Sequence, residues 1–339
     1  MDGSPMRHSF GWVCCFFRDS IEFFLDSCYN RQTNVLLKKE VLEMVLELRN
    51  IEKSFGEKQV LKGVTFTAEG GKAFGLLGRN GAGKTTSIRI LMNVFPSNSG
   101  EVLIDGKPID YDKIGIGYLP EERGLYPKKV IIDQLVYFAE LKGMSSKDAV
   151  KAVDYWLARL GMSEYRNKKL DTLSKGNQQK IQLVTALAHN PDIVILDEPF
   201  SGLDPVNAML LKDVVKEQIA KGKIVLFSSH QMSYIEEFCD SIAILNAGKV
   251  AICGDLHEIK RTYPRDKLVV NTQAPEKIKA DLGEICTERE DGSLLVQLAS
   301  PNDKQAMMKC LVERYDVDEV KVFEPSLNDI FVEYAGAQV

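Results

Sequence analysis

The sequence has no long apolar stretch, no cysteine motif and no excess of basic charge, and each absence excludes a class of protein. No run of residues is apolar enough to cross a bilayer, since the nearest candidate, Trp12 to Ser27, is interrupted by Arg18, Asp19, Glu22 and Asp26. That stretch also lacks the continuous apolar region and the cleavage site of a signal peptide. Any membrane span that the protein works with is therefore expected on another chain.

Cysteine spacing and net charge exclude further classes. The seven cysteines show no Cys-x-x-Cys spacing and no nearby histidine cluster, which favours reduced thiols in a cytosolic protein. The 43 basic and 48 acidic residues give a formal net charge of −5, so electrostatics give no reason to expect nucleic acid as a main partner. With 339 residues, 45% of them hydrophobic and 27% charged, the chain has the composition of a globular protein with room for two domains.

Residues 1–43 differ in composition from the rest and hold three of the seven cysteines. Apolar residues recur at helical spacing from Phe10 to Cys28, which predicts an amphipathic helix on a membrane or a partner, although its opposite face is acidic. The alternative is that this extension is not native and that Met44 is the true start, because residues 38–41 are compatible with ribosome-binding codons. Both interpretations stay open.

A glycine-rich loop stands between an apolar run and an amphipathic segment. Residues 73–77 are typical of a buried strand, and residues 85–94 carry apolar side chains at helical spacing. Between them, GRNGAGKT (78–85) fits the P-loop pattern G-x-x-x-x-G-K-S/T in the strand–loop–helix context that the pattern requires. Backbone N–H groups can surround phosphate oxygens, the lysine can reach the β- and γ-phosphates, and the threonine hydroxyl can bind Mg²⁺. The predicted nucleotide-binding residues of this loop are Gly78, Asn80, Gly81, Gly83, Lys84, Thr85 and Thr86.

An acidic pair follows a second apolar run. Residues 193–196 are four consecutive apolar residues, which is typical of a buried parallel strand. The run ends in Asp197 and Glu198, at the strand end where an α/β sheet presents its ligands. Asp197 suits a Mg²⁺ shell, and Glu198 suits polarising the attacking water. A merely solvated acidic pair is the alternative, and the P-loop upstream disfavours it.

The motifs, in their order along the chain, resemble those of the ATP-binding cassette (ABC) superfamily over about residues 46–259. The P-loop is followed by LSKGNQQK (173–180), VILDEP (194–199), SGLD (201–204) and LFSSH (226–230). PEERGLYP (120–127) and the ending EPSLNDIFVEYAG (324–336) narrow the resemblance to ATP-binding subunits of bacterial two-component exporters of the sodium- or drug-exporter type.

The resemblance implies an α/β P-loop NTPase fold for residues 44–262, with a RecA-like core, an antiparallel β-subdomain and a helical subdomain at about 122–175. In that subdomain, Trp156 and Tyr137 are expected in the core. For residues 266–339, strand and helix patterns predict the order βαββαβα, which suggests a small ferredoxin-like α+β domain.

The resemblance also assigns roles residue by residue. Phe55 would stack on adenine, His230 would contact the γ-phosphate, and Asp204 would communicate with the opposite subunit. The predicted catalytic residues are thus Glu198, His230 and Lys84, and the predicted Mg²⁺ ligands are Thr85, Asp197 and, as a further candidate, Glu121. The remaining histidines, His8, His189 and His257, match no motif and are interpreted as structural.

Two motifs depart from the family pattern. Glu121 stands where the family usually has glutamine, which alters the charge offered to metal or partner. The signature loop, usually LSGGQ, has Lys175 for its first glycine and Asn177 for its glutamine, while Ser174 and Gly176 are kept. A solvated Lys175 is favoured over one that contacts a phosphate.

In this family two ATPase subunits pair head to tail, and each ATP lies between one subunit's P-loop and the other's signature loop. Ser174, Gly176 and Asn177, before an expected helix over 178–189, would thus meet ATP bound by another subunit. The implied ligands are ATP and Mg²⁺. The implied partners are an integral-membrane permease and a second copy or a paired ATPase subunit, at the cytoplasmic face of the cell membrane.

Two other functions are weaker interpretations. A soluble ABC ATPase acting on ribosomes or DNA usually has two cassettes or a long coiled coil, and the chain has one P-loop and no sustained heptads between residues 84 and 174. A P-loop small-molecule kinase gives no reason for the signature loop or for His230.

Overall fold

The computed structural model describes residues 44–122, 124–201, 203–229, 231–289 and 291–336. The predictions for residues 1–43 and for His230 therefore lie outside the described residues. Within these ranges, we find no helix that combines the length and the apolarity needed to cross a membrane.

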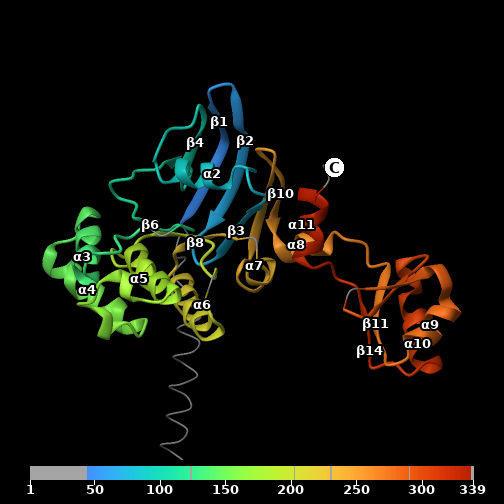
Figure 1. The fold of residues 1–339 in the computed structure, drawn as a ribbon. Helices are drawn as coiled ribbons and strands as arrows, with labels where there is room; N and C mark the ends of the chain where they lie inside the picture. The colour runs from blue at the N-terminus through green and yellow to red at the C-terminus, as the bar shows by residue number, and fades with distance from the viewer. Residues whose placement is uncertain (1–43, 123, 202, 230, 290, 337–339) are drawn as a thin grey trace, which may run out of the picture. The chain divides into compact units, whose positions relative to one another are not determined.

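The centre of the ATPase part is a six-stranded sheet with the order β10-β9-β3-β8-β7-β6 (Figure 1). The strands from β9 to β6 are parallel to their neighbours, and β10 is antiparallel to β9. Their bounds are β3 (Ala73–Gly78), β6 (Ile116–Leu119), β7 (Ile193–Asp197), β8 (Ile224–Ser228), β9 (Ser241–Asn246) and β10 (Lys249–Asp255). The runs predicted as buried strands at 73–77 and 193–196 are β3 and β7.

Successive residues of β7 face two different cores. Ile193 and Ile195 belong to the core shared with the antiparallel sheet, and Val194 and Leu196 belong to the core shared with the helices. All four side chains are buried, which explains why the run has no polar residue. The two cores therefore cover both faces of the central sheet.

On one face lie a second sheet and the P-loop helix (Figure 1). The sheet is antiparallel with the order β2-β1-β4-β5, and the helix is α2 (Lys84–Leu91). The strands are β1 (Val45–Phe55), β2 (Lys58–Glu69), β4 (Ser99–Ile104) and β5 (Lys107–Pro108). On the other face lie α5 (Lys175–Leu187), α6 (Pro205–Ala220) and α7 (Met232–Phe238).

The segment before the signature loop is helical, with α3 (Ile131–Leu141) and α4 (Ser146–Arg159), followed by the short 3-10 turns η1 (Ser163–Tyr165) and η2 (Leu170–Thr172). The predicted core position of Trp156 is confirmed, whereas that of Tyr137 is wrong, since its side chain is exposed. The Tyr137 ring contacts that of Phe138, its neighbour in sequence, at a centroid distance of 5.7 Å and an interplanar angle of 60°.

The signature helix begins earlier than predicted. We expected a helix over 178–189, but α5 starts at Lys175, so the signature residues form its first turn. The reason is local: Ser174 is the N-cap, and its Oγ accepts a hydrogen bond from the Asn177 N–H at 3.4 Å.

The C-terminal lobe follows α8 (Leu256–Arg261) and has the predicted element order. Its antiparallel sheet has the strand order β12-β13-β11-β14, and α9 and α10 pack on it in one core (Figure 1). The elements are β11 (Lys267–Asn271), α9 (Pro275–Leu282), η3 (Gly283–Ile285), β12 (Cys286–Glu288), β13 (Leu294–Gln297), η4 (Pro301–Asp303), α10 (Lys304–Arg314) and β14 (Glu319–Val322).

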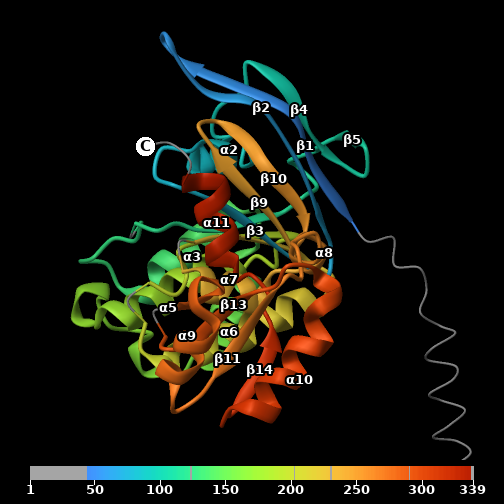
Figure 2. The ribbon, with the colours of Figure 1, turned by 90° about the vertical axis from the view of Figure 1, so that its right-hand side faces the viewer.

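The last helix, α11 (Leu327–Gly336), packs on the ATPase core rather than on the lobe (Figure 2). Leu327 and Ile330 are fully buried in the same core as Ile235 of α7 and Ile244 of β9. The Asn246 side chain, at the end of β9, donates a 3.0 Å hydrogen bond to the Tyr334 carbonyl. The chain thus leaves the ATPase domain, builds the lobe and returns to the ATPase core.

Candidate functional site

A cleft of about 570 Å³ collects most of the residues that the sequence predicted to bind nucleotide and metal. It opens where β3 and β7 end, the edge at which parallel sheets usually bind ligands. The lining residues are Val60, Arg79, Asn80, Gly81, Gly83, Lys84, Thr85, Thr86, Glu121, Asp197 and Glu198. Residues far apart in sequence, from the P-loop, the segment after β6 and the end of β7, therefore share one site.

Two glycines let the P-loop fold closely around this cleft. Gly83, the N-cap of α2, has a φ of 112°, and a Cβ there would lie 2.5 Å from Leu61 Cδ2. At Gly78 a Cβ would lie 2.6 Å from the Leu245 carbonyl oxygen. At Gly78 a side chain would collide with backbone, and at Gly83 the positive φ itself disfavours any other residue, so both positions need glycine.

Lys84 lies between the P-loop carbonyls and the acidic side chains. Its Nζ donates hydrogen bonds to the carbonyl oxygens of Gly78 and Arg79. Burial lowers the pKa of Lys84, and the negative charges of Asp197 and Glu198 oppose that shift. The lysine is thus a partly buried cation held against the loop, where a phosphate oxygen would be a stronger acceptor than a carbonyl.

Asp197 and Glu198 are the buried carboxylates at the end of β7. Burial raises the pKa of Asp197, and the nearby charges of Glu121 and Glu198 raise it further. The Tyr118 hydroxyl lies 3.4 Å from Asp197 Oδ2, and burial, followed by the Asp197 charge, raises the pKa of Tyr118 to about 12. Tyr118 thus supports Asp197 as a hydrogen-bond donor, a contact that no sequence motif indicated.

The acidic side chains fit a magnesium ion that arrives with the nucleotide. Among the described residues, no three His, Cys, Asp or Glu side chains form a metal site by themselves. Mg²⁺ is usually held by one or two carboxylates together with phosphate oxygens and water. Thr85 and Asp197 line the same cleft as the phosphate-binding loop, and a divalent cation would offset the clustered negative charge that raises the pKa of Asp197.

The backbone of Glu198 is strained and firmly held. Its φ is 48°, in the left-handed region, where a residue other than glycine costs about 1–3 kcal/mol. Its N–H donates to the Ser228 carbonyl at 2.8 Å, and its Oε2 accepts a 2.8 Å hydrogen bond from Ser229 Oγ. The end of β8 therefore holds Glu198 by backbone and side chain. Ser229 was not predicted, although its place next to His230 in LFSSH was a usable signal.

Several predicted residues do not line this cleft. Phe55 ends β1 with 51% of its surface exposed, so it is not a core aromatic. It makes an edge-to-face contact with Phe95 at a centroid distance of 5.4 Å, under Lys53 Nζ.

The signature residues and Asp204 also lie outside the cleft. Ser174 and Asp204 are exposed helix caps, and Asp204 Oδ1 accepts from the Asn207 N–H at 2.9 Å. Gly176 and Asn177 lie in the first turn of α5.

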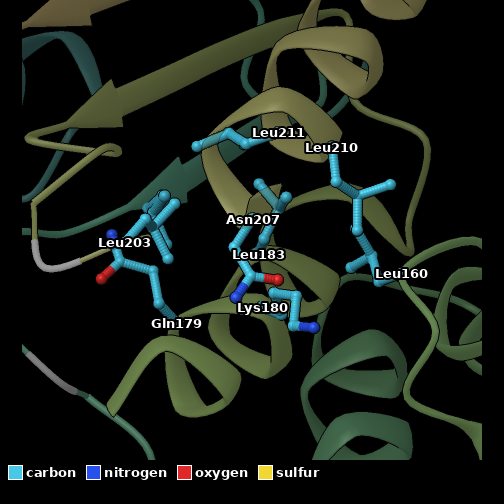
Figure 3. A pocket seen from close by; sticks show the side chains of 9 residues that line it. Leu160, Gln179, Lys180, Leu183, Leu203, Asn207, Leu210 and Leu211 are labelled. Carbon is cyan, nitrogen blue, oxygen red and sulfur yellow. The ribbon is translucent and has the colours of Figure 1, made fainter. Parts of the chain in front are cut away.

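The signature helix and the helix after SGLD meet directly (Figure 3). Figure 3 shows Gln179 and Lys180 of α5 close to Leu203 and Asn207, and the space between them, about 10 Å³, is barely enough for one water. Gln179 Nε2 donates a 2.8 Å hydrogen bond to the Pro199 carbonyl, directly after Glu198. This junction is packed rather than a ligand site, and it connects the signature helix with the acidic strand end.

The parallel sheet, the P-loop and the buried acidic pair define a P-loop nucleoside triphosphatase fold, and comparisons with known proteins narrow the class. Residues 61–201 match the family described as ABC transporter, and residues 254–335 match the C-terminal domain described as ATP-binding protein DrrA1-3-like. The solved "Structure of ATP binding subunit of ABC transporter" superposes with a TM-score of 0.60 and 31% identity over 64% of this chain and 92% of that one.

The relatives that the chain matches over most of its length are also described as ATP-binding proteins. The ABC transporter ATP-binding protein YhaQ of Bacillus subtilis is 41% identical over 295 residues, 86% of this chain and 99% of that one. The linearmycin resistance ATP-binding protein LnrL of the same organism is 34% identical, over 62% of this chain and 69% of that one. The Nod factor export ATP-binding protein I of Burkholderia lata is 29% identical, over 78% of this chain and 89% of that one.

The chain belongs to the ABC transporter ATP-binding proteins and carries an ABC ATPase domain followed by a DrrA1-3-like C-terminal domain. The family predicted from the sequence is confirmed.

Proposed function

We propose that this protein is the ATP-hydrolysing subunit of an ABC exporter, which pairs head to tail with a second ATPase subunit around two ATP molecules and drives a separate permease. The observation that carries the proposal is the cleft in which the P-loop, Asp197 and Glu198 meet. The names of relatives that export Nod factor or confer linearmycin resistance support the outward direction.

In this function the residues of the cleft have different roles in phosphate binding, metal binding and hydrolysis. The P-loop N–H groups and Lys84 bind the phosphates, and Glu198 orients and polarises the attacking water. Thr85 and Asp197, with Glu121 as a further candidate, would hold Mg²⁺, which supplies charge neutralisation at the phosphates. Phe55, exposed beyond the cleft, offers a ring face for adenine. The γ-phosphate contact of His230 stays a prediction.

The signature residues act on the ATP of the partner subunit in this proposal. Ser174 is exposed at the start of α5 and does not line the cleft of its own chain. The first turn of α5 is the N-terminal, positive end of the helix dipole, which favours an anion. Asp204, at the start of α6, would face the same partner. Removal of the γ-phosphate would then open the dimer.

The permease would dock in a second cleft, of about 520 Å³. It is mostly apolar and lies between the end of α2 and the helical subdomain, where Met92, Leu125, Phe138 and Leu141 are among its lining residues. The exposed side chain of Val94 also lines this cleft, and the exposed ring of Tyr137 contacts that of Phe138, another lining residue. A helix of the permease that enters this cleft from the membrane side would place the chain at the cytoplasmic face of the membrane.

We propose an ATPase domain, 44–262, and a C-terminal region, 266–339, in which the lobe is followed by α11, the helix that returns to the ATPase core. The family matches to residues 61–201 and 254–335 support two such regions. The strand order β12-β13-β11-β14, with antiparallel pairs throughout, supports a ferredoxin-like topology for the lobe.

Two variants test the proposal. Glu198→Gln should bind ATP, hydrolyse it very slowly and accumulate ATP-bound dimers in gel filtration, because the amide cannot polarise water. Near-normal turnover would remove Glu198 from this role.

Ser174→Arg should abolish hydrolysis and leave ATP binding by the monomer intact, because the arginine blocks the partner's site. Equal loss of ATP binding in Ser174→Arg would show that the signature loop does not act across a dimer.

A further inference from the structure

The hydroxyl group of Ser229, directly after β8, has two hydrogen bonds that fix its direction. The backbone N–H of Gln231 donates to Ser229 Oγ at 3.1 Å, which uses a lone pair of the hydroxyl. The hydroxyl hydrogen then points to Glu198 Oε2, 2.8 Å away, because an ionised carboxylate can only accept hydrogen bonds. The Ser229 side chain is thus aligned for Glu198 by the turn that begins α7.

This contact is buried at the edge of the nucleotide cleft. Ser229 is 3% and Glu198 is 6% exposed, yet Glu198 still lines the cleft with Lys84 and Thr85. A hydrogen bond to an ionised group is strong when water is excluded. Because Oε2 is engaged at the end of β8, the two carboxylate oxygens are no longer equivalent. Rotation of the carboxylate would break the contact.

We propose that Ser229 is a positioning residue for ATP hydrolysis, because its hydroxyl holds the Glu198 carboxylate in the orientation that polarises the attacking water. The proposal rests on the role proposed above for Glu198. Ser229 does not line the nucleotide cleft, so it would act only through that carboxylate. Its loss should therefore lower the rate of the chemical step and leave ATP binding unchanged.

The test compares Ser229→Ala and Ser229→Thr with Ser233→Ala, a control at an exposed serine of α7. In Ser229→Ala we expect kcat for ATP to fall about tenfold or more, with KM and the Kd for ATP within twofold of wild type. Ser229→Thr should recover most of the rate because it keeps the hydroxyl, and Ser233→Ala should match wild type. Wild-type kcat in Ser229→Ala, or a failure of threonine to recover the rate, would overturn the proposal.

A double variant tests whether Ser229 works through Glu198. Glu198→Gln/Ser229→Ala should turn over no more slowly than Glu198→Gln alone, whereas independent effects that add would overturn the proposal. A normal rate in Glu198→Gln would instead show that the proposed role of Glu198 is wrong. Unchanged ATP affinity shows that Ser229→Ala is folded; if affinity is lost, Ser229→Cys, of similar shape and with a weaker donor, replaces it and should again slow only kcat.

Discussion

Gln179 Nε2, on the signature helix, donates a 2.8 Å hydrogen bond to the carbonyl oxygen of Pro199, the residue after Glu198. One amide therefore connects the helix that begins at Ser174 with the loop that carries the proposed water-polarising residue. In a head-to-tail dimer, that helix would serve the partner's ATP and the loop would serve the chain's own ATP. In such a dimer this bond would connect the two nucleotide sites directly.

We expect Gln179→Leu to lower the ATPase rate by about two- to tenfold, since a partly buried hydrogen bond of ordinary strength is lost. Nucleotide affinity of the monomer should not change, because Gln179 does not line the nucleotide cleft. Steady-state ATPase assays and fluorescent-nucleotide titrations check both statements. Gln305→Leu, at an exposed position of α10, is the matched control. Equal rates in the two variants would show that the bond is dispensable.

Lys175→Gly should leave ATPase kinetics within twofold of wild type. Lys175 is exposed at the first position of α5, where its long side chain can extend into water. If the ammonium group instead contacts the partner's γ-phosphate, KM for ATP will rise in Lys175→Gly, and the rise will shrink as salt is added. A salt series of ATPase measurements on both proteins distinguishes these results.

Stability should fall below pH 6.5 through His189, at the end of the signature helix. Burial lowers the pKa of His189 to about 4, and the charges of Lys142 and Lys223 add to the shift. The unfolded chain therefore binds more protons than the folded one between pH 6.5 and 4, so the contribution of His189 to stability is present above that window and is lost as the pH falls. Between pH 7 and 5, the free energy of unfolding of wild type should fall by about 2 kcal/mol more than that of His189→Gln.

Urea unfolding of the two proteins at several pH values checks this expectation. Carboxylates also titrate at acidic pH, and the comparison cancels their contribution to the unfolding free energy because both proteins contain them. Parallel curves of unfolding free energy against pH would contradict the predicted shift.

Leu327→Ala should destabilise the ATPase core by about 2–5 kcal/mol, the usual cost of emptying a fully buried leucine site. Val332→Ala, on the same helix but 58% exposed, should change stability by less than about 0.5 kcal/mol. Urea midpoints, followed by the loss of bound nucleotide, measure the ATPase domain itself. Similar midpoints for the two variants would mean that α11 does not complete this core.

Local patterns were enough to predict much of this structure. The apolar runs at 73–77 and 193–196 are central strands, and the element order after residue 266 agrees with the prediction. The P-loop and the acidic pair also meet in one cleft, as their places at strand ends indicated. These features depend on short-range periodicity and on the rule that parallel strands end at a common edge.

Contacts between residues far apart in the sequence could not be predicted from local patterns. Ser229 meets Glu198 only because β8 pairs with β7, and Gln179 meets Pro199 only because α5 packs below the sheet. The predicted order βαββαβα ends in a helix, but a local pattern cannot say which of two cores that helix will fill. The early start of α5 depends on the Ser174 cap, whereas the sequence pattern places the helix only from residue 178 on.

The return of α11 to the ATPase core sets the order in which the newly made chain can fold. The ribosome releases the strands of the central sheet first, then the lobe, and α11 after both. Until Leu327 and Ile330 emerge, the core beside β9 has an open apolar side, while the lobe already has all of its own strands. The lobe can therefore be finished before the domain that precedes it. Nascent chains that stall inside the lobe would present that open side to chaperones and proteases.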